Sequence, residues 1–386
     1  MKIVLVVSEY PAVSETFVAA KFRGLVEAGW DVEVAAGRGR REKRVRVAWP
    51  HRPRWLAAAL LPAAAARCLW AAPRTTLRYL ARGWLRRLYL DAEIVAARPD
   101  VVHFEFGALA VGRMYLAELA GCKIVVSFRG FDLNHAGLDV AGYYDEVWER
   151  VAAVHCLSRD LWEKAQRRGC PAGKAHAILS PAIDTEYFGG VTRAPAGDRP
   201  VRLVSVGRLE WTKGYEYALE AVAALRASGM PVDYRIVGAG EHLEAVAFCR
   251  HQLGLEDCVK LIGAAGRERV RAELEWADIF LHTAVTEGFC NAVIEAQASG
   301  LPVVTSDAGG LPENVEDGVT GFVVQRRDPR ATAEKLMRLA QDPAMRERMG
   351  QAGRERARRC FSLPVHVRAF QDFYERAGQP DLARRA

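Results

Sequence analysis

Short apolar runs alternate with longer amphipathic stretches along the first half of the chain. The runs have the length of buried strands and cover residues 2–7, 31–36, 100–106, 123–128, 152–158 and 175–179. Between the first two runs, SETFVAAKFRGLVEAG (14–29) has the apolar spacing of an amphipathic helix. Strands that alternate with helices indicate a parallel sheet covered by helices, so this half predicts an α/β domain.

The second half repeats this alternation with its own series of strands. Its apolar runs cover residues 201–207, 233–240, 259–263, 279–284, 302–307 and 321–324. The segment before them, GGVTRAPAGDRP (189–200), has few large apolar residues and is rich in Gly and Pro, which is typical of a linker. We therefore expect two Rossmann-like domains, residues 1–190 and 198–360, that face a central cleft.

A closing helix is predicted after residue 360. The aromatic residues at positions 370, 373 and 374 fall on one helical face, which needs an apolar surface to cover it. Segment 361–386 is therefore expected to form a C-terminal helix that can pack back on the N-terminal domain.

Composition favours a folded intracellular protein. With 386 residues, 50% of them hydrophobic, the chain can bury one large core or two medium ones, which excludes disorder. The eight cysteines are scattered, without a C-x-x-C pair or the spacing of a zinc site or disulfide framework, and this favours a reducing cytoplasm. The apolar run that ends before Ser8 is too short for a signal-peptide core, so we expect a buried strand there.

Positive charge is concentrated in residues 38–87, which hold fourteen Arg or Lys and a single acid, Glu42. This window carries +13 and the rest of the chain −6, within a formal net charge of +7. Such a block suits nucleic acid, an anionic membrane or an acidic substrate, or is simply a solvated basic face, and composition does not distinguish these.

Residues 54–73 within this block are apolar and rich in Ala, but Pro62 and Arg67 interrupt them and make a membrane-spanning helix a poor interpretation. Trp55 and Trp70, together with the surrounding arginines, instead predict one or two amphipathic helices at a membrane surface. The alternative is a helical hairpin packed on the N-terminal domain, and both can hold together.

Candidate chemistry is densest in residues 286–324, where a loop, a helix and a strand follow one another. If the helix begins near Phe289, its first free amides can bind an anion, with Glu287 just outside that end and Glu295 about two turns inside. A continuous helix separates these carboxylates by roughly 12 Å. This distance is too long for both to act on one bond, but it suits contacts with two parts of an elongated ligand such as a nucleotide sugar. The alternative is that both are ordinary helix-surface acids.

Two more segments point to a diphosphate. Arg208 and Lys213 follow the strand 201–207, and the carboxyl ends of strands in doubly wound sheets bind ligands. Two cations at that edge can neutralise a diphosphate leaving group. The pair Gly238 and Gly240 lacks the third glycine of the dinucleotide fingerprint and is weak evidence by itself.

Taken together, these segments resemble glycosyltransferase family 4, the retaining enzymes of GT-B fold. The motifs occur in a specific order: G-R-x-x-x-x-K-G at 207–214, G-x-G at 238–240, E-G-F-x-N-x-x-x-E-A at 287–296 and D-x-G-G-x-P-E at 307–313. The resemblance covers the C-terminal half and, more loosely, the N-terminal half. YPAVSETFV at 10–18 is similar to the branch that builds exopolysaccharides and other surface glycans.

The resemblance implies a donor site for a nucleotide sugar. Arg208 and Lys213 would bind its diphosphate and Glu295 its ribose, while Glu287 and the main-chain amides of Phe289, Cys290 and Asn291 would hold the sugar. It also implies transfer without a metal or other cofactor, by same-face attack through an oxocarbenium-like state, with no protein nucleophile. We prefer UDP over GDP as the donor nucleotide.

The acceptor side is expected in the N-terminal half. SFRGFDLN (127–134) matches the family's H-G-x-D segment, except that Arg129 replaces the histidine. Because Arg is a fixed cation, we infer that Arg129 contacts the donor phosphate or an anionic acceptor, the alternative being a salt bridge to Asp132. Further candidates are Ser14 near the diphosphate, and His103, Glu105 and Asp132 on the acceptor side, although His103 and Glu105 are more often structural.

The preferred acceptor is a lipid-linked sugar or an oligosaccharide, because residues 38–87 suit the anionic inner face of a membrane. A soluble small-molecule acceptor and a catalytically degenerate sugar-nucleotide-binding protein remain alternatives. A nucleic-acid-binding protein would leave both glutamates unexplained, so we expect no nucleic-acid partner. An oxidoreductase would need glycines in the first loop, SEYPAVSETF, which has none.

Overall fold

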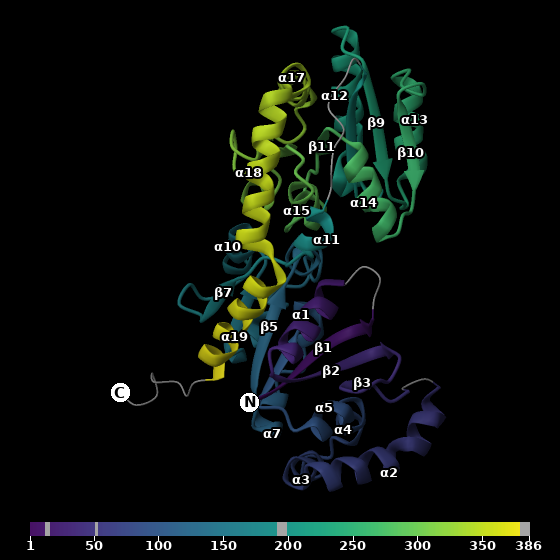
Figure 1. Cartoon of the computed structure of the whole chain (residues 1–386). Coiled ribbons are helices and arrows are strands. Elements are labelled where there is room, and N and C mark those ends of the chain that lie inside the picture. The colour runs from purple at the N-terminus through teal and green to yellow at the C-terminus, as the bar shows by residue number, and fades with distance from the viewer. Residues whose placement is uncertain (12–15, 51–52, 191–198, 379–386) are drawn as a thin grey trace. The chain divides into compact units, whose positions relative to one another are not determined.

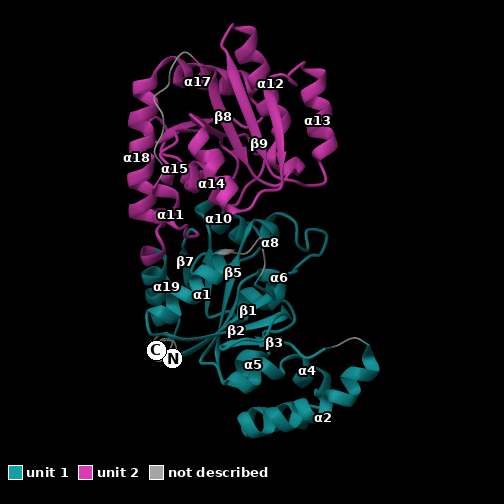
Figure 2. Ribbon diagram, turned by 45° about the vertical axis from the view of Figure 1, so that its right-hand side comes forward, with its two compact units in different colours: residues 1–180, 366–386 teal, residues 181–365 magenta. Residues whose placement is uncertain are grey.

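The computed structural model describes residues 1–11, 16–50, 53–190 and 199–378. The chain forms two compact units, one of residues 1–180 with 366–386 and the other of residues 181–365 (Figure 2). The first unit ends earlier than residue 190, and almost all of the last helix belongs to it.

The first unit is built on a seven-stranded parallel sheet in the order β3-β2-β1-β4-β5-β6-β7 (Figure 1). Its strands are β1 (Lys2–Tyr10), β2 (Asp31–Gly39), β3 (Val45–Val47), β4 (Val101–Phe104), β5 (Lys123–Phe128), β6 (Ala153–Cys156) and β7 (His176–Ile178). The central strands are apolar and buried on both faces, which is typical of parallel sheets covered by helices. The short edge strand β3 was not predicted, because three residues give too little pattern.

Helices connect these strands, and most are short. They are α1 (Thr16–Glu27), α2 (Arg54–Ala71), α3 (Pro73–Ala81), α4 (Leu85–Leu90), α5 (Ala92–Ala97), α6 (Gly107–Ala110), α7 (Leu116–Ala120), α8 (Gly130–Asn134), α9 (Asp145–Arg150), α10 (Arg159–Arg167) and α19 (Leu363–Gly378). The apolar face predicted for α19 is buried in this unit through Phe370, Phe373 and Tyr374.

The second unit has a six-stranded parallel sheet in the order β10-β9-β8-β11-β12-β13. Its strands are β8 (Val201–Val206), β9 (Val232–Val237), β10 (Val259–Gly263), β11 (Ile279–His282), β12 (Val303–Ser306) and β13 (Gly321–Val324). Its helices are α11 (Thr185–Gly189), the 3₁₀ helix η1 (Trp211–Lys213), α12 (Tyr215–Ala227), α13 (Leu243–Gln252), α14 (Arg267–Trp276), α15 (Asn291–Ala298), α16 (Leu311–Asn314), α17 (Pro329–Gln341) and α18 (Pro343–Phe361).

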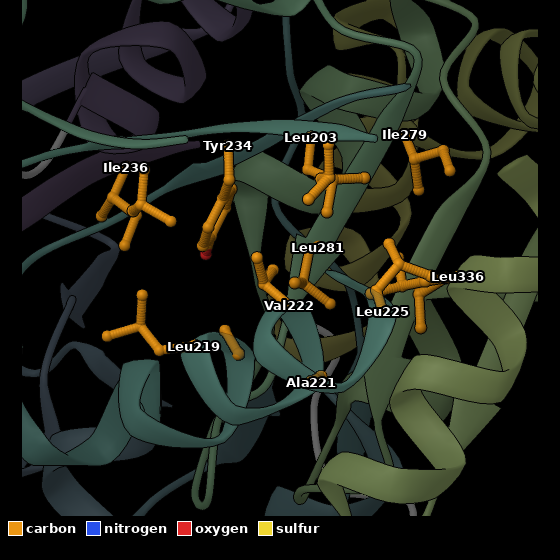
Figure 3. Packing of buried hydrophobic residues seen from close by; sticks show 14 of the residues in the cluster. Leu203, Leu219, Ala221, Val222, Leu225, Tyr234, Ile236, Ile279, Leu281 and Leu336 are labelled. Carbon is orange, nitrogen blue, oxygen red and sulfur yellow. The ribbon is translucent and has the colours of Figure 1, made fainter. Parts of the chain in front are cut away.

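Apolar side chains from sheet and helices form the core of the second unit (Figure 3). Leu203 and Leu281 from neighbouring strands are fully buried, as are Leu219 and Val222 of α12 and Leu336 of α17. The buried positions of α12 recur at helical spacing, so this helix lays one apolar stripe on the sheet. The core fixes the strand ends, and with them the loops that follow β8 and β11.

The apolar segment at 54–73 forms one helix, α2, with Pro62 inside it. Ala64, Cys68 and Ala71 are buried, and the Cys68 thiol lies 3.6 Å from the carbonyl oxygen of Ala92 on α5. The hairpin of α2 and α3 therefore packs on the rest of the first unit, which agrees with the helical hairpin given as the alternative for this segment. None of the helices in the described ranges has both the length and the apolar character that crossing a membrane requires.

Candidate functional site

The strand order of the second unit reverses between β8 and β11, and the carboxyl ends of such neighbouring strands form the usual ligand site of doubly wound sheets. Lys213 closes η1, in the loop after β8, and Glu287 follows β11. Their side chains form an ion pair, and each keeps only 14% of its surface exposed. The fold thus brings together two predicted site residues from segments that are far apart in sequence.

Burial and pairing act in opposite directions on these two groups. Burial alone raises the pKa of Glu287, but the charges of Lys213 and His282 outweigh it and hold the pKa at about 2. Burial likewise lowers the pKa of Lys213, while Glu287 outweighs it and leaves the pKa raised. Both groups are therefore charged at neutral pH, and the pair is a dipole that an anionic ligand can rearrange.

His282 is a site residue that the sequence analysis missed. It ends β11, and its Nε2 lies 3.5 Å from Oε2 of Glu287. Burial lowers the pKa of His282, but nearby Cys290 and Glu287 stabilise the imidazolium and raise the pKa to about 9. Its position at a strand end, five residues before Glu287, is the signal that the sequence offers, and for a lone histidine this signal is weak.

The helix that carries the second glutamate begins later than expected. It starts at Asn291, not near Phe289, because the Asn314 side chain holds Cys290 in an extended conformation. Asn314 Oδ1 accepts a hydrogen bond from the Cys290 N–H at 3.3 Å, and its Nδ2 donates to the Cys290 carbonyl at 3.0 Å. The expected set of free amides is therefore corrected: the amide of Cys290 already has a partner, and the Phe289 side chain is buried beside Phe361.

Glu295 consequently lies one turn into α15 rather than two. Burial raises the pKa of its carboxyl to about 7, although Arg267 opposes this. Within the described residues, no ion pair or side-chain hydrogen bond involves this carboxyl group. A partly buried carboxyl group without a protein partner is poised to accept hydrogen bonds from a ligand.

Arg208 and the two predicted glycines shape the loop after β8. The Arg208 side chain is 72% exposed and pairs with Glu210 at 2.7 Å, a surface contact that an incoming anion can displace. Side chains at Gly238 or Gly240 would collide with the carbonyl oxygens of Gly207 and Leu209. The G-x-G pair thus serves close packing of this loop against the end of β9.

In the first unit, Arg129 lies in a buried charge cluster. Its Nη2 donates to Oε2 of Glu105 at 3.0 Å, and the other carboxylate oxygen of Glu105 pairs with Lys21. The guanidinium also lies over the Phe17 ring, 3.8 Å from its centroid. The alternative of a salt bridge to Asp132 is not what these contacts show, because Asp132 accepts instead from the backbone N–H groups of Arg129 and Ala108.

His103 belongs to a chain of hydrogen bonds that ties α19 to the sheet. Its Nδ1 lies 2.6 Å from the Tyr374 hydroxyl and its Nε2 2.7 Å from the Ser127 hydroxyl, which in turn lies 2.7 Å from Nδ1 of His155. Because His155 Nε2 must donate to the carbonyl of Leu179, Ser127 donates to His155, and His103 donates to Ser127. Burial lowers the pKa of both histidines well below 6.5, so both are neutral.

The structure therefore places His103, Glu105 and Asp132 in the interior of the first unit, and not on a surface open to an acceptor, because each is fully buried. Ser14 lies outside the described residues.

Comparisons with known proteins cover both halves of the chain. Residues 193–356 match the family model of glycosyl transferases group 1, and residues 14–179 match a glycosyl transferase 4-like domain. WcaL of Escherichia coli K12, which carries the name of a colanic acid biosynthesis glycosyltransferase, is 30% identical over 88% of this chain and 91% of its own length. The amylovoran biosynthesis glycosyltransferase AmsK of Erwinia amylovora is 34% identical over 73% of this chain and 70% of its own.

Solved structures show the same fold at lower identity. Anabaena HepE, solved in complex with UDP, has a TM-score of 0.73 at 16% identity and covers 97% of this chain and 100% of its own. Sucrose-phosphate synthase from Thermosynechococcus elongatus has a TM-score of 0.71 at 18% identity and covers 97% of this chain and 98% of its own.

The two parallel sheets and the charged site after β8 and β11 define a glycosyltransferase of GT-B fold. The chain belongs to glycosyltransferase family 4. Within this family it is similar to WcaL and AmsK, two glycosyltransferases named for exopolysaccharide biosynthesis.

Proposed function

We propose that this glycosyltransferase moves a sugar from UDP-sugar, with retention of configuration, to a lipid-linked or oligosaccharide acceptor during surface polysaccharide assembly. The observation that carries the proposal is the buried Lys213 and Glu287 pair at the switch point of the second sheet. The names of WcaL and AmsK support the polysaccharide role, and the UDP complex of HepE supports the choice of nucleotide.

The donor rearranges the charges of this site. Its diphosphate attracts the ammonium of Lys213 and the exposed guanidinium of Arg208, which together offset the charge that develops on the leaving group. Released from Lys213, the Glu287 carboxylate accepts hydrogen bonds from sugar hydroxyls. The protein's own cations thus take the part of a metal ion in leaving-group departure, so we propose that transfer needs no divalent metal.

Glu295 binds the ribose in this proposal. Its carboxyl lacks a partner within the described residues, and a vicinal diol offers two donors to it. Because these donors favour the ionised form, nucleotide binding lowers a pKa that burial has raised to about 7. The acceptor hydroxyl then attacks the same face that the diphosphate leaves, and the leaving phosphate takes its proton.

Thermal unfolding with UDP, GDP and ADP, each without added metal, tests the donor site. We expect UDP alone to raise the unfolding temperature, since a ligand at 100 times its dissociation constant adds about 2.7 kcal/mol of stability. A larger rise with GDP would correct the base, and no rise with any of the three would contradict the proposed donor site.

We also propose that the α2 and α3 hairpin rests on an anionic membrane surface, where a lipid-linked acceptor is found. Trp55 and Trp70 are 71% and 87% exposed. Arg54, Arg74 and Arg86 are exposed and form no ion pair with other described residues. Exposed indole rings beside unpaired cations suit the interface of an anionic bilayer.

Vesicle sedimentation tests this surface. Replacing Trp55 and Trp70 together by serine should weaken binding to vesicles of mixed neutral and anionic phospholipid by at least about tenfold, because burying each ring is worth about 1.5 to 3 kcal/mol. Phe248→Ser, which removes an exposed aromatic ring of the second unit, is the control. Equal binding of the double variant and the wild-type protein would overturn the membrane surface.

A further inference from the structure

The second unit holds a group of metal-ligand atoms that the proposed transfer reaction does not need. Within the described residues, a nitrogen of His282, a carboxylate oxygen of Glu287 and the sulfur of Cys290 all lie within 4.8 Å of one another. The residues come from the end of β11 and from the loop that leads to α15. This grouping was not predicted, because the cysteines of the sequence show no C-x-x-C pair and no zinc-site spacing.

His282 is buried and incompletely hydrogen-bonded within the described residues. This side chain is 3% exposed, and its Nε2 is buried without a hydrogen-bond partner among the described residues. Oε2 of Glu287 lies 3.5 Å from this nitrogen, at ion-pair distance. A buried, unpartnered ring nitrogen beside a carboxylate and a thiol is an arrangement in which a bound cation would satisfy all three groups.

The donor set selects the kind of ion. Imidazole, thiolate and carboxylate are the ligands of Zn²⁺, whereas Mg²⁺ and Ca²⁺ prefer oxygen alone. Ligand atoms of a tetrahedral zinc site lie about 3.4 to 3.6 Å apart, given bond lengths of about 2.0 to 2.3 Å. The separation between His282 and Glu287 is close to this spacing, and the sulfur of Cys290, within 4.8 Å of both, can reach it with a small shift of its side chain.

We propose that His282, Glu287 and Cys290 form a binding site for Zn²⁺, with the fourth position open to water. Coordination displaces protons from the imidazole and the thiol and draws Glu287 away from Lys213. The metal is a competitor and not a cofactor, because it occupies the carboxylate that the sugar would use. That last consequence rests on the proposed function, whereas the binding site itself does not.

Direct binding tests the site without any sugar transfer. The metal-free protein is titrated with Zn²⁺ against a chromophoric chelator, and with Co²⁺, whose thiolate complexes have a charge-transfer absorption. We expect one bound ion, loss of the cobalt–thiolate band in Cys290→Ser, and an affinity lower by at least about tenfold in both Cys290→Ser and His282→Gln. Because Cys290→Ser is nearly isosteric, this variant still tests the site if His282→Gln fails to fold.

Matched controls come from the surface of the same chain. His251 is exposed and paired with Glu256, and Cys360 is an exposed thiol, so His251→Gln and Cys360→Ser should leave the tight site unchanged. Lys213→Met should bind Zn²⁺ more tightly, because the ammonium no longer competes for Glu287. No ion bound by the wild-type protein, or equal affinity in Cys290→Ser, would overturn the site.

The two proposals fail in different ways. Zinc binding without any effect of UDP would keep the metal site and contradict the donor site. Stabilisation by UDP without zinc binding would keep the donor site and contradict the metal site. If both hold, Zn²⁺ should weaken UDP-sugar binding in the wild-type protein, and Cys290→Ser should reduce that inhibition.

Discussion

Replacing Lys213 by alanine is expected to lower the transfer rate by about 10² to 10³-fold and to abolish stabilisation by UDP. In the proposed donor complex, the substitution removes a cation that offsets the charge of the leaving diphosphate. It also leaves the Glu287 carboxylate without its ammonium partner, with His282 and Cys290 still beside it. The measurement is sugar transfer or donor hydrolysis, together with thermal unfolding with and without UDP.

The change also costs stability, because removal of one partner from a buried ion pair costs about 3 to 5 kcal/mol. Lys213→Met, which keeps the length of the side chain, and Lys213→Arg, which keeps its charge, separate packing from electrostatics. Lys260→Ala, on the exposed side of β10, is the control. A Lys213→Ala protein that UDP still stabilises as strongly as the wild-type protein would show that the diphosphate binds elsewhere.

A loss of stability at least as large is expected from Glu105→Ala in the first unit. This carboxylate is fully buried and is shared by Lys21 and Arg129, whose side chains are also buried. Its removal leaves two cations in the interior, at a cost of about 3 to 5 kcal/mol. For a unit of this size the unfolding temperature should fall by roughly 6 to 20 °C.

Lys21 moderates this loss. Burial lowers the pKa of its ammonium to about 8, although Glu105 opposes the shift, so without Glu105 the amine can lose its proton and become neutral. Arg129 cannot become neutral in this way, since its guanidinium stays charged. The measurement is thermal unfolding, with hydrogen exchange in β4 and β5 to locate the effect.

Glu118→Ala is the matched control, because it breaks an ion pair with Arg82 at the surface and should cost less than about 1 kcal/mol. Equal unfolding temperatures for Glu105→Ala and the wild-type protein would mean that the buried cluster does not hold the first unit together.

The strands and the donor motif could be predicted from the sequence, because both depend on residues that are neighbours along the chain. Apolar runs gave every strand of the second sheet, and the spacing of Glu287 and Glu295 placed them in a loop and the helix after it. The start of α15 could not be predicted, because it depends on Asn314, which lies more than twenty residues away.

The charge clusters around Glu105 and around His282 could not be predicted from the sequence either. Glu105 and Arg129 lie on the ends of adjacent parallel strands, and no pattern along the chain shows that Lys21 of α1 reaches the same carboxylate. His282 was overlooked for the same reason: its partners are set by the loop after β11, and a lone histidine at a strand end carries little signal.

By itself, the sequence determined the alternation of strands and helices, the basic segment 38–87 and the order of the motifs that mark glycosyltransferase family 4. Periodicity and composition are local properties of the chain, so they can be recognised without a structure. Only the tertiary structure decided which charges meet, which carboxyl stays unpaired and where a cysteine, a histidine and a glutamate converge. Electrostatic interactions depend on distance and burial in space, and these are fixed only when the sheets assemble.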